Sequence, residues 1–281
     1  MFLKAVGIVF ALLILAGGYL FLSYRRSAED TDRAWAEIAA AARPPVALFD
    51  PATVSHLPEV ARRYFLHAIA PGTPLRTTVE LRLKGTFLLG DRTSSQRYDM
   101  EASQILAPPN QFVWTPILRS GLLTIAGSDG LIDGKAWTRF WIASLLPVAN
   151  VPSSADLVRS AQFRSAIEGI WAPASLLPRD GIVWKAAGPN TASVTIDLPH
   201  GPIVVALTMD STGALIEVVG MRWSDANPQK LFQLQPFGGT IEREATFEGY
   251  TIPSVVMVGN MFGTSDYFPF YRAQVLQAIY R

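Results

Sequence analysis

GIVWKAAGPNTASVTIDLPHGPIVVALTMD, residues 181–210, decides the fold. Short apolar runs alternate here with clusters of turn-forming residues such as Gly188-Pro189-Asn190. Because a short loop returns each strand beside the previous one, this rhythm predicts an antiparallel meander. It continues as far as residue 259, and the predicted strands cover residues 182–187, 192–198, 203–209, 214–223, 241–248 and 252–259.

A long hairpin is predicted upstream, over residues 77–102. Apolar Val79 and Leu81 alternate with charged residues in its first strand, as do Tyr98 and Met100 in its second. Two amphipathic strands cannot bury their apolar side alone, so we expect helices or a ligand to cover it. Further strands are predicted within residues 108–151, where Asp129-Gly130 and Asp133-Gly134 are interpreted as turn dipeptides and not as calcium ligands.

Helical periodicity predicts helices at residues 28–42, 55–70 and 154–170, with Ser55 placed to cap the second. The third carries a buried stripe made of Phe163, Ala166, Ile167, Ile170 and Trp171. Residues 263–281 are predicted to end as a short helix packed on the sheet.

The predicted fold class is therefore α+β. We expect a large curved antiparallel sheet, a meander or half-barrel, with about three helices on its concave side and a transmembrane helix at the N-terminus. Residues 1–27 would be the anchor and juxtamembrane segment, residues 28–53 a helical linker, and residues 54–281 a single β-rich domain.

The anchor is predicted from residues 5–22, an uncharged run preceded by Lys4 and followed by Arg25-Arg26. Its length suits a bilayer-spanning helix and exceeds that of a usual signal-peptide core, and no clear cleavage site follows. Basic residues flank both ends, so the positive-inside rule gives opposing signals. Since long β-rich domains are commonly translocated, we expect an extracytoplasmic body on a single-pass anchor.

Composition excludes several classes of function. Basic and acidic residues number 24 and 23, so no global field favours nucleic acid. The chain has no cysteine and only three histidines, which excludes disulfides, thiolate catalysis and cysteine-ligated metals. Phosphate-binding and dinucleotide-binding glycine motifs are missing as well. We therefore expect no metal or cofactor.

Acid–base catalysis by a buried carboxylate remains possible on the sequence. The candidates for an acid or base are Glu101, Glu168 and Glu248, if a fold brings one into a cavity. Glu242 and Glu244 share one strand face with Glu248 by parity, which is more simply a solvated side.

Tryptophans give the clearest hint of a binding site. Six of them fall on or beside predicted strands or at a helix end, where each can bury apolar area and still present its N–H to a pocket. Core packing explains any one of them. The predicted ligand-binding residues are Trp114, Trp137, Trp141, Trp171, Trp184 and Trp223, with Phe163 and Ile167 from the third helix.

Several blocks resemble a bacterial family of uncharacterised, N-terminally anchored proteins. The resemblance runs from about residue 57 to the C-terminus, and its most specific block is Trp171-Ala172-Pro173-Ala174-Ser175-Leu176-Leu177-Pro178. The other blocks are Phe112-Val113-Trp114, Leu145-Leu146-Pro147-Val148-Ala149, Pro236-Phe237-Gly238-Gly239 and Gly249-Tyr250-Thr251-Ile252-Pro253. Where the family usually has Ala-Glu-Gln, this chain has Ala102-Ser103-Gln104, so a catalytic glutamate is not implied at that position.

The resemblance implies no activity, but it implies a bacterial inner membrane as the location. The expected architecture is similar to that of the periplasmic lipoprotein carriers (LolA and LolB), whose hydrophobic hollow holds acyl chains. Our first hypothesis is thus a lipid or other apolar ligand bound between sheet and helices. The alternatives are an enzyme acting on an envelope lipid or glycan through a buried carboxylate, and a scaffold that docks a protein partner.

Overall fold

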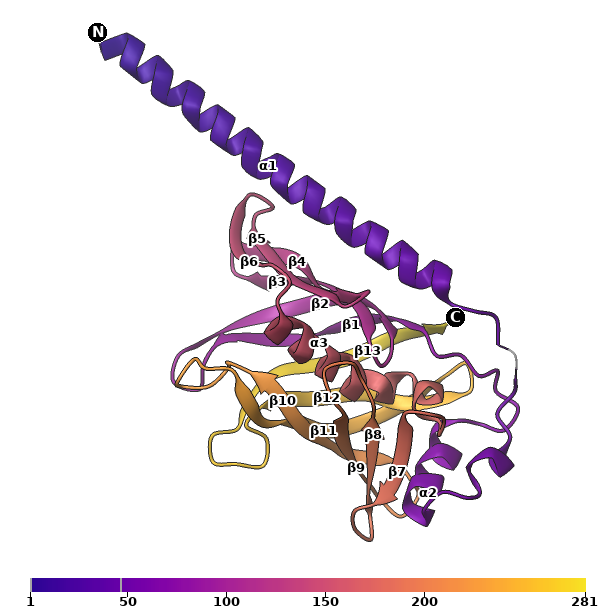
Figure 1. The fold of residues 1–281 in the computed structure, drawn as a ribbon. Helices are drawn as coiled ribbons and strands as arrows, with labels where there is room; N and C mark the ends of the chain where they lie inside the picture. The colour runs from indigo at the N-terminus through magenta and orange to yellow at the C-terminus, as the bar shows by residue number, and fades with distance from the viewer. Residues whose placement is uncertain (1, 46) are drawn as a thin grey trace.

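The protein, described here by a computed structural model of residues 2–45 and 47–281, is built on one antiparallel sheet. Thirteen strands lie in the order β6-β5-β4-β3-β2-β1-β13-β12-β11-β10-β9-β8-β7. The sheet curves around a helix, α3 (Ala155–Ile167), while the long N-terminal helix α1 (Phe2–Ala41) projects from the body (Figure 1). The predicted α+β class with a large curved sheet is confirmed.

Two meanders make up the sheet. The first contains β1 (Val79–Gly90), β2 (Ser95–Ala107), β3 (Gln111–Ser120), β4 (Leu123–Ile132), β5 (Lys135–Ile142) and β6 (Leu146–Val151). The second contains β7 (Ile182–Ala186), β8 (Thr191–Ile196), β9 (Ile203–Met209), β10 (Leu215–Ser224), β11 (Gln233–Phe247), β12 (Tyr250–Asn260) and β13 (Phe268–Tyr280). Every strand predicted from the turn spacing is present, and β11 begins eight residues earlier than expected. Asp133-Gly134 forms the predicted turn, whereas Asp129-Gly130 lies inside β4, so the turn prediction is wrong there.

The last strand joins the two meanders. β13 pairs with β1 from Val79 opposite Tyr280 to Phe87 opposite Tyr271. The helix predicted at the C-terminus is therefore wrong. A register shift in this pairing places the buried residues Val275 and Ala278 three apart, and that spacing imitates a helix.

The connection between the meanders crosses the concave face. It runs from β6 at one sheet edge to β7 at the other, through α3 and two 3-10 helices, η2 (Glu168–Trp171) and η3 (Pro173–Leu176). Thirteen strands about 4.8 Å apart would make a flat sheet about 58 Å wide. The 13 residues of α3 span only about 20 Å. The sheet is curved, and α3 lies inside the curve (Figure 1).

Local caps set where the helices begin. The hydroxyl of Ser154 accepts a hydrogen bond from the Leu157 amide at 3.1 Å and starts α3. Ser55 caps no α-helix, contrary to prediction, because it ends the 3-10 turn η1 (Pro51–Val54), and α2 (Glu59–Ala68) begins after Pro58.

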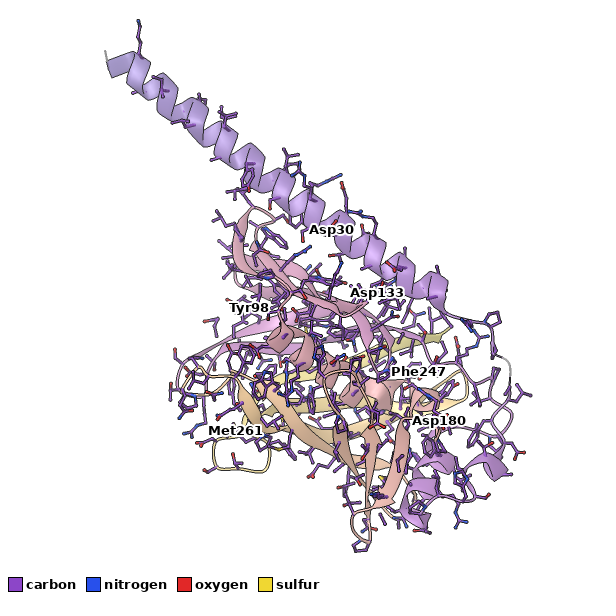
Figure 2. All side chains as sticks on the ribbon, viewed as in Figure 1. Asp30, Tyr98, Asp133, Asp180, Phe247 and Met261 are labelled. Carbon is purple, nitrogen blue, oxygen red and sulfur yellow. The ribbon has the colours of Figure 1, made fainter. Side chains whose placement is uncertain are left out.

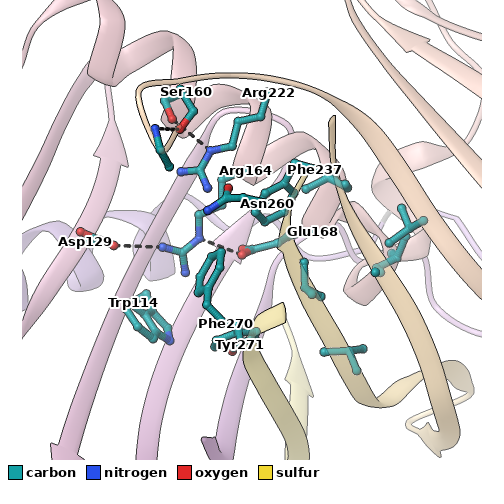
Figure 3. Close-up of a pocket in the computed structure, with 18 of the residues that line it drawn as sticks. Trp114, Asp129, Ser160, Arg164, Glu168, Arg222, Phe237, Asn260, Phe270 and Tyr271 are labelled. Atoms are coloured by element: carbon teal, nitrogen blue, oxygen red, sulfur yellow. Dashed lines mark hydrogen bonds and ion pairs between the residues drawn. The ribbon is translucent and has the colours of Figure 1, made fainter. Parts of the chain in front are cut away.

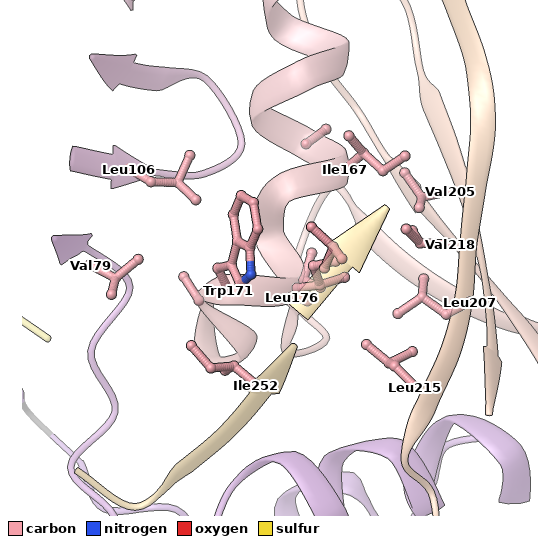
Figure 4. Packing of buried hydrophobic residues seen from close by; sticks show 14 of the residues in the cluster. Val79, Leu106, Ile167, Trp171, Leu176, Val205, Leu207, Leu215, Val218 and Ile252 are labelled. Atoms are coloured by element: carbon pink, nitrogen blue, oxygen red, sulfur yellow. The ribbon is translucent and has the colours of Figure 1, made fainter. Parts of the chain in front are cut away.

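The main core lies between the concave face and α2, α3 and η2. Figure 4 shows Trp171 at its centre, surrounded by aliphatic side chains from both meanders. The stripe predicted on the third helix is buried as expected. The Trp171 indole donates a hydrogen bond to the Pro253 carbonyl at 3.0 Å, which fixes η2 on β12.

Helix α1 lies on the opposite face of the sheet. Its apolar first part is long enough to cross a membrane. Its last turns pack on β2, β3 and β4, where Ile38 is buried with Ile105 and Val113. Thr31 hydrogen-bonds Ser128 at 2.8 Å. Asp30, labelled in Figure 2, forms an ion pair with Arg139, and 3.4 Å separates its Oδ2 from the Arg139 Nη1. The expected anchor and the start of the expected linker thus form one unbroken helix.

We expect replacement of Phe65 by alanine to lower the free energy of unfolding by about 3–5 kcal/mol, because a fully buried ring is lost and a cavity remains. Phe65 contacts Trp184 with ring centroids 5.2 Å apart. Leu66, exposed on the same helix, is the matched control, and Leu66→Ala should change stability by less than about 0.5 kcal/mol. Urea unfolding of the full chain in detergent, followed by tryptophan fluorescence, compares the two. Equal effects would contradict the packing of α2.

Candidate ligand-binding pocket

A pocket of about 360 Å³ lies between α3 and the concave face. Residues of α3, η2, β1, β3, β4 and β10 to β13 line it, so both meanders contribute (Figure 3). Its volume falls in the range of roughly 300–1,000 Å³ that is usual for small-molecule sites.

Most of the lining is apolar. Aromatic rings dominate one part, where Phe87 and Phe270 meet edge to face at 5.4 Å. Aliphatic side chains of α3 and the sheet complete the wall. The apolar and aromatic lining residues are Phe87, Trp114, Leu157, Ile167, Ile170, Trp171, Val218, Phe232, Phe237, Ile241, Val256, Val258, Phe270 and Tyr271.

Arg164 of α3 lines the pocket and forms ion pairs with two carboxylates. Its Nε donates to Glu168 Oε1 at 2.8 Å, and its Nη1 donates to Asp129 Oδ2 at 3.2 Å. The guanidinium also lies 4.6 and 4.9 Å from the ring centroids of Phe112 and Trp114. Burial alone would lower the pKa of Arg164, but Glu168 and Asp129 outweigh it and raise that pKa. Arg164 is thus a firmly held cation.

Arg222 of β10 is partly buried and has no such partner within the described part of the chain. Its Nε donates to the Ser160 hydroxyl at 3.1 Å, and its guanidinium lies 5.0 Å from the Phe237 ring centroid. Among the described residues no carboxylate lies within ion-pair distance of it. Burial, reinforced by the charge of Arg164, lowers the pKa of Arg222 to about 10. The terminal nitrogens of Arg222 therefore remain available to a ligand.

Three further polar atoms of the lining are buried and lack a hydrogen-bond partner within the described chain. They are the donor Trp114 Nε1 and the oxygens Asp129 Oδ1 and Asn260 Oδ1. A buried polar atom without a partner costs about 1–3 kcal/mol, so such atoms are normally satisfied. All three atoms belong to residues that line this one pocket.

The structure brings three of the eight predicted ligand-binding residues to the pocket: Trp114, Trp171 and Ile167. Phe163 packs behind the wall against Phe237. The remaining four tryptophans lie elsewhere. Trp137 and Trp141 face α1, and Trp184 packs on α2. Trp223 lies outside the pocket lining, where its indole donates to Asp156 and its ring stacks under the Arg159 guanidinium.

Of the three candidate carboxylates, only Glu168 lies in the pocket. Glu101 is exposed beside Arg119, and Glu248 lies in the turn after β11 and accepts from the Tyr280 amide at 3.2 Å. The prediction that Glu242, Glu244 and Glu248 share one strand face is wrong. Bulges in β11 separate them: Glu242 pairs with Arg272, and Glu244 contacts His67 at 2.6 Å.

Sequence reasoning missed Arg164, Arg222 and Asp129. The available signal was a charge inside an apolar run, as at Met221-Arg222-Trp223, and the four-residue spacing of Arg164 and Glu168 on one helix face. Asp129 pairs with Arg164 across 35 residues, and no local pattern predicts that contact.

Comparison with known proteins gives a family and two distant structural similarities. A family model described as "Family of unknown function (DUF6544)" matches residues 47–273. No curated protein matches the sequence significantly. A LolA superfamily protein from Nitrosomonas europaea is similar at 6% identity and a TM-score of 0.39, covering 79% of this chain and 92% of that one. A DUF1329 family protein from Desulfovibrio piger is similar at 9% identity and a TM-score of 0.40, covering 73% and 86%.

The two buried arginines should respond oppositely to replacement. Arg164→Met leaves Glu168 and Asp129 as buried, unpaired charges, and we expect a loss of about 3–5 kcal/mol in the free energy of unfolding. Arg222→Met removes a cation whose pKa the fold lowers, so stability at neutral pH should be unchanged or higher. Denaturant unfolding at pH 7 checks both. A large loss in Arg222→Met would show that Arg222 has a structural partner.

Proposed function

This chain belongs to the DUF6544 family, and we propose that it binds one amphipathic, lipid-like molecule in the pocket beneath α3. The observation that carries this proposal is the combination of a mostly apolar wall with unpartnered buried polar groups. An apolar chain fits the wall and a polar head fits those groups.

Burial of the ligand's apolar part would drive binding. Each Å² of apolar surface removed from water contributes about 25 cal/mol before the entropy of association is subtracted. The wall is already assembled by the packing of α3 and η2 on the sheet, so little protein rearrangement is needed.

The head group is proposed to be acidic. Arg222 has terminal donors free, and Trp114 Nε1 adds another donor in the same pocket. A carboxylate or phosphate would supply the anion that Arg222 lacks within the protein, and charge-assisted hydrogen bonds of this kind are the stronger ones. Asn260 and Asp129 Oδ1 would accept from a hydroxyl or protonated group on the same ligand.

A binding role agrees with the state of Glu168. Its Oε1 accepts from Arg164 at 2.8 Å and its Oε2 accepts from Gln104 at 2.6 Å. Both oxygens are therefore engaged, and a general acid or base needs a free one in reach of the reacting group. This observation ranks ligand binding above the envelope-lipid or glycan enzyme.

The location proposed is the bacterial inner membrane. Helix α1 supplies one candidate span, and the body would lie on the extracytoplasmic side, as expected for a long β-rich domain behind a single anchor. The ligand would then be a lipid of the cell envelope.

Filling the pocket should abolish binding. Val258→Trp places a large side chain among the lining residues, whereas Val183→Trp adds the same bulk at a half-exposed position outside the lining. We expect a dansylated fatty acid to show enhanced fluorescence with the full chain in detergent and with Val183→Trp, but at least tenfold weaker binding to Val258→Trp. Binding that is equal in all three proteins would overturn the proposal.

Head-group selectivity should depend on Arg222. We expect Arg222→Met to weaken binding of a fatty acid by about 10- to 100-fold, because a hydrogen bond to a charged group contributes about 1.5–3 kcal/mol. Binding of the fatty alcohol of equal length should stay within twofold. Arg159→Met, which removes the same charge beside Trp223, is the control. Equal losses for acid and alcohol would contradict an acidic head group.

A further inference from the structure

Six loops turn at one end of the sheet, and we call the five nearest the pocket and α1 the rim, leaving out the β8–β9 loop. They are residues 91–94, 121–122, 143–145, 225–232 and 261–267, between β1–β2, β3–β4, β5–β6, β10–β11 and β12–β13. Register places neighbours side by side: Asn260 pairs with Phe237 and Phe268, and the Ala143 amide donates to the Thr124 carbonyl at 3.0 Å.

The pocket opens at the rim. Exposed Asp225 and Ala226, together with Phe232, belong to its lining and lie in the β10–β11 loop. Asn260, at the end of β12, lines it from the neighbouring loop. A ligand therefore enters from this end of the sheet.

Helix α1 leaves the body at the same end. Its contacts move along the sheet in order: Ile38 lies beside Val113 near the far end, Thr31 beside Ser128 in the middle, and Tyr24 beside Trp141 near the rim. The apolar residues 5–22 continue in that direction, past the β5–β6 hairpin (Figure 1). The rim and the candidate membrane span thus face the same way.

Apolar side chains are exposed on the rim. Leu122 is fully exposed at the tip of its loop, and Leu146 is 54% exposed beside the β5–β6 turn. Others follow around the pocket mouth, and the set comprises Leu122, Leu145, Leu146, Leu231, Phe232 and Leu234. Large apolar side chains clustered on one end of a domain indicate a surface that contacts something other than water.

We propose that the rim contacts the bilayer in which α1 is anchored, and that the pocket exchanges its ligand directly with that bilayer. The exchange rests on the proposed ligand binding, whereas the contact rests only on the proposed membrane location of α1. Residues 5–22 span about 27 Å as a helix, close to the thickness of about 30 Å of the hydrocarbon core. Tyr19 and Leu22 of this segment share a crevice with Trp141 and Asn150, so the adjoining hairpin tip lies at membrane depth.

A lipid surface is favoured over a protein partner because α1 fixes the distance between the rim and the membrane-spanning residues 5–22. The helix is continuous from residue 2 to residue 41 and is held on the sheet by buried contacts. Tyr24 and Trp141, with ring centroids 5.6 Å apart, lie where the apolar run ends, and amphipathic aromatic rings favour that interfacial level.

Site-specific labelling tests the contact cleanly because the chain has no cysteine. Leu122→Cys and Leu146→Cys place an environment-sensitive NBD fluorophore on the rim. Leu48→Cys places it at an exposed position at the opposite end, where Leu48 bridges Pro74. In nanodiscs holding the full chain, we expect brominated phospholipids to quench the two rim labels at least twofold and to leave the Leu48 label unchanged. Rim labels that behave like the Leu48 label would overturn the proposal.

Transfer kinetics separate this proposal from the proposed function. Leu122→Asp with Leu146→Asp should slow uptake of a dansylated fatty acid from phosphatidylglycerol-containing vesicles at least tenfold, with affinity in detergent unchanged. Unchanged uptake would overturn direct exchange while leaving ligand binding intact. Quenched rim labels in a protein that binds no fatty acid would instead support the contact and overturn the pocket's proposed function.

Discussion

Pairing between the first and last strands holds this structure together. β1 and β13 lie almost 200 residues apart in the chain, yet their register makes one sheet of two meanders. With the sheet continuous, the α3 connection must cross its concave face to reach the other edge. The pocket follows from that crossing, since α3 meets Trp114 of the first meander and Val256 of the second. A pocket formed in this way depends on the pairing of strands far apart in the chain.

The two arginines of the pocket differ in their partners, and this difference separates a structural arginine from a candidate ligand-binding one. Arg164 is neutralised by Glu168 and Asp129, and it links α3 to β4. In the described part of the chain, Arg222 donates to a hydroxyl and lies over an aromatic ring, and burial lowers its pKa. Proteins retain such costs mainly at sites that bind or react. The missing carboxylate partner, more than its degree of exposure, is the reason why Arg222 is proposed to bind a ligand.

How much the sequence predicts depends on how local the signal is. Turn dipeptides and alternation predict β7 to β10 within one or two residues, because both signals are contained in a few neighbouring side chains. The C-terminal strand escapes, since the extra residue near Val275 disrupts alternation and a bulge is set by the partner strand. Tryptophan identity locates only part of the pocket: Trp114 faces inward while Trp137, two strands away, faces α1. Long-range pairing decides which face each one occupies.

The unbroken helix α1 also limits how the body moves. A domain on a bending tether reorients freely and presents every side to its surroundings in turn. Here no joint separates residues 5–22 from the turns packed on β2 to β4, so under the proposed membrane location the body would tilt only together with the helix. Rotation about the bilayer normal and lateral diffusion would then remain as the free motions, and the proposed anchor would confine any search by this molecule to two dimensions.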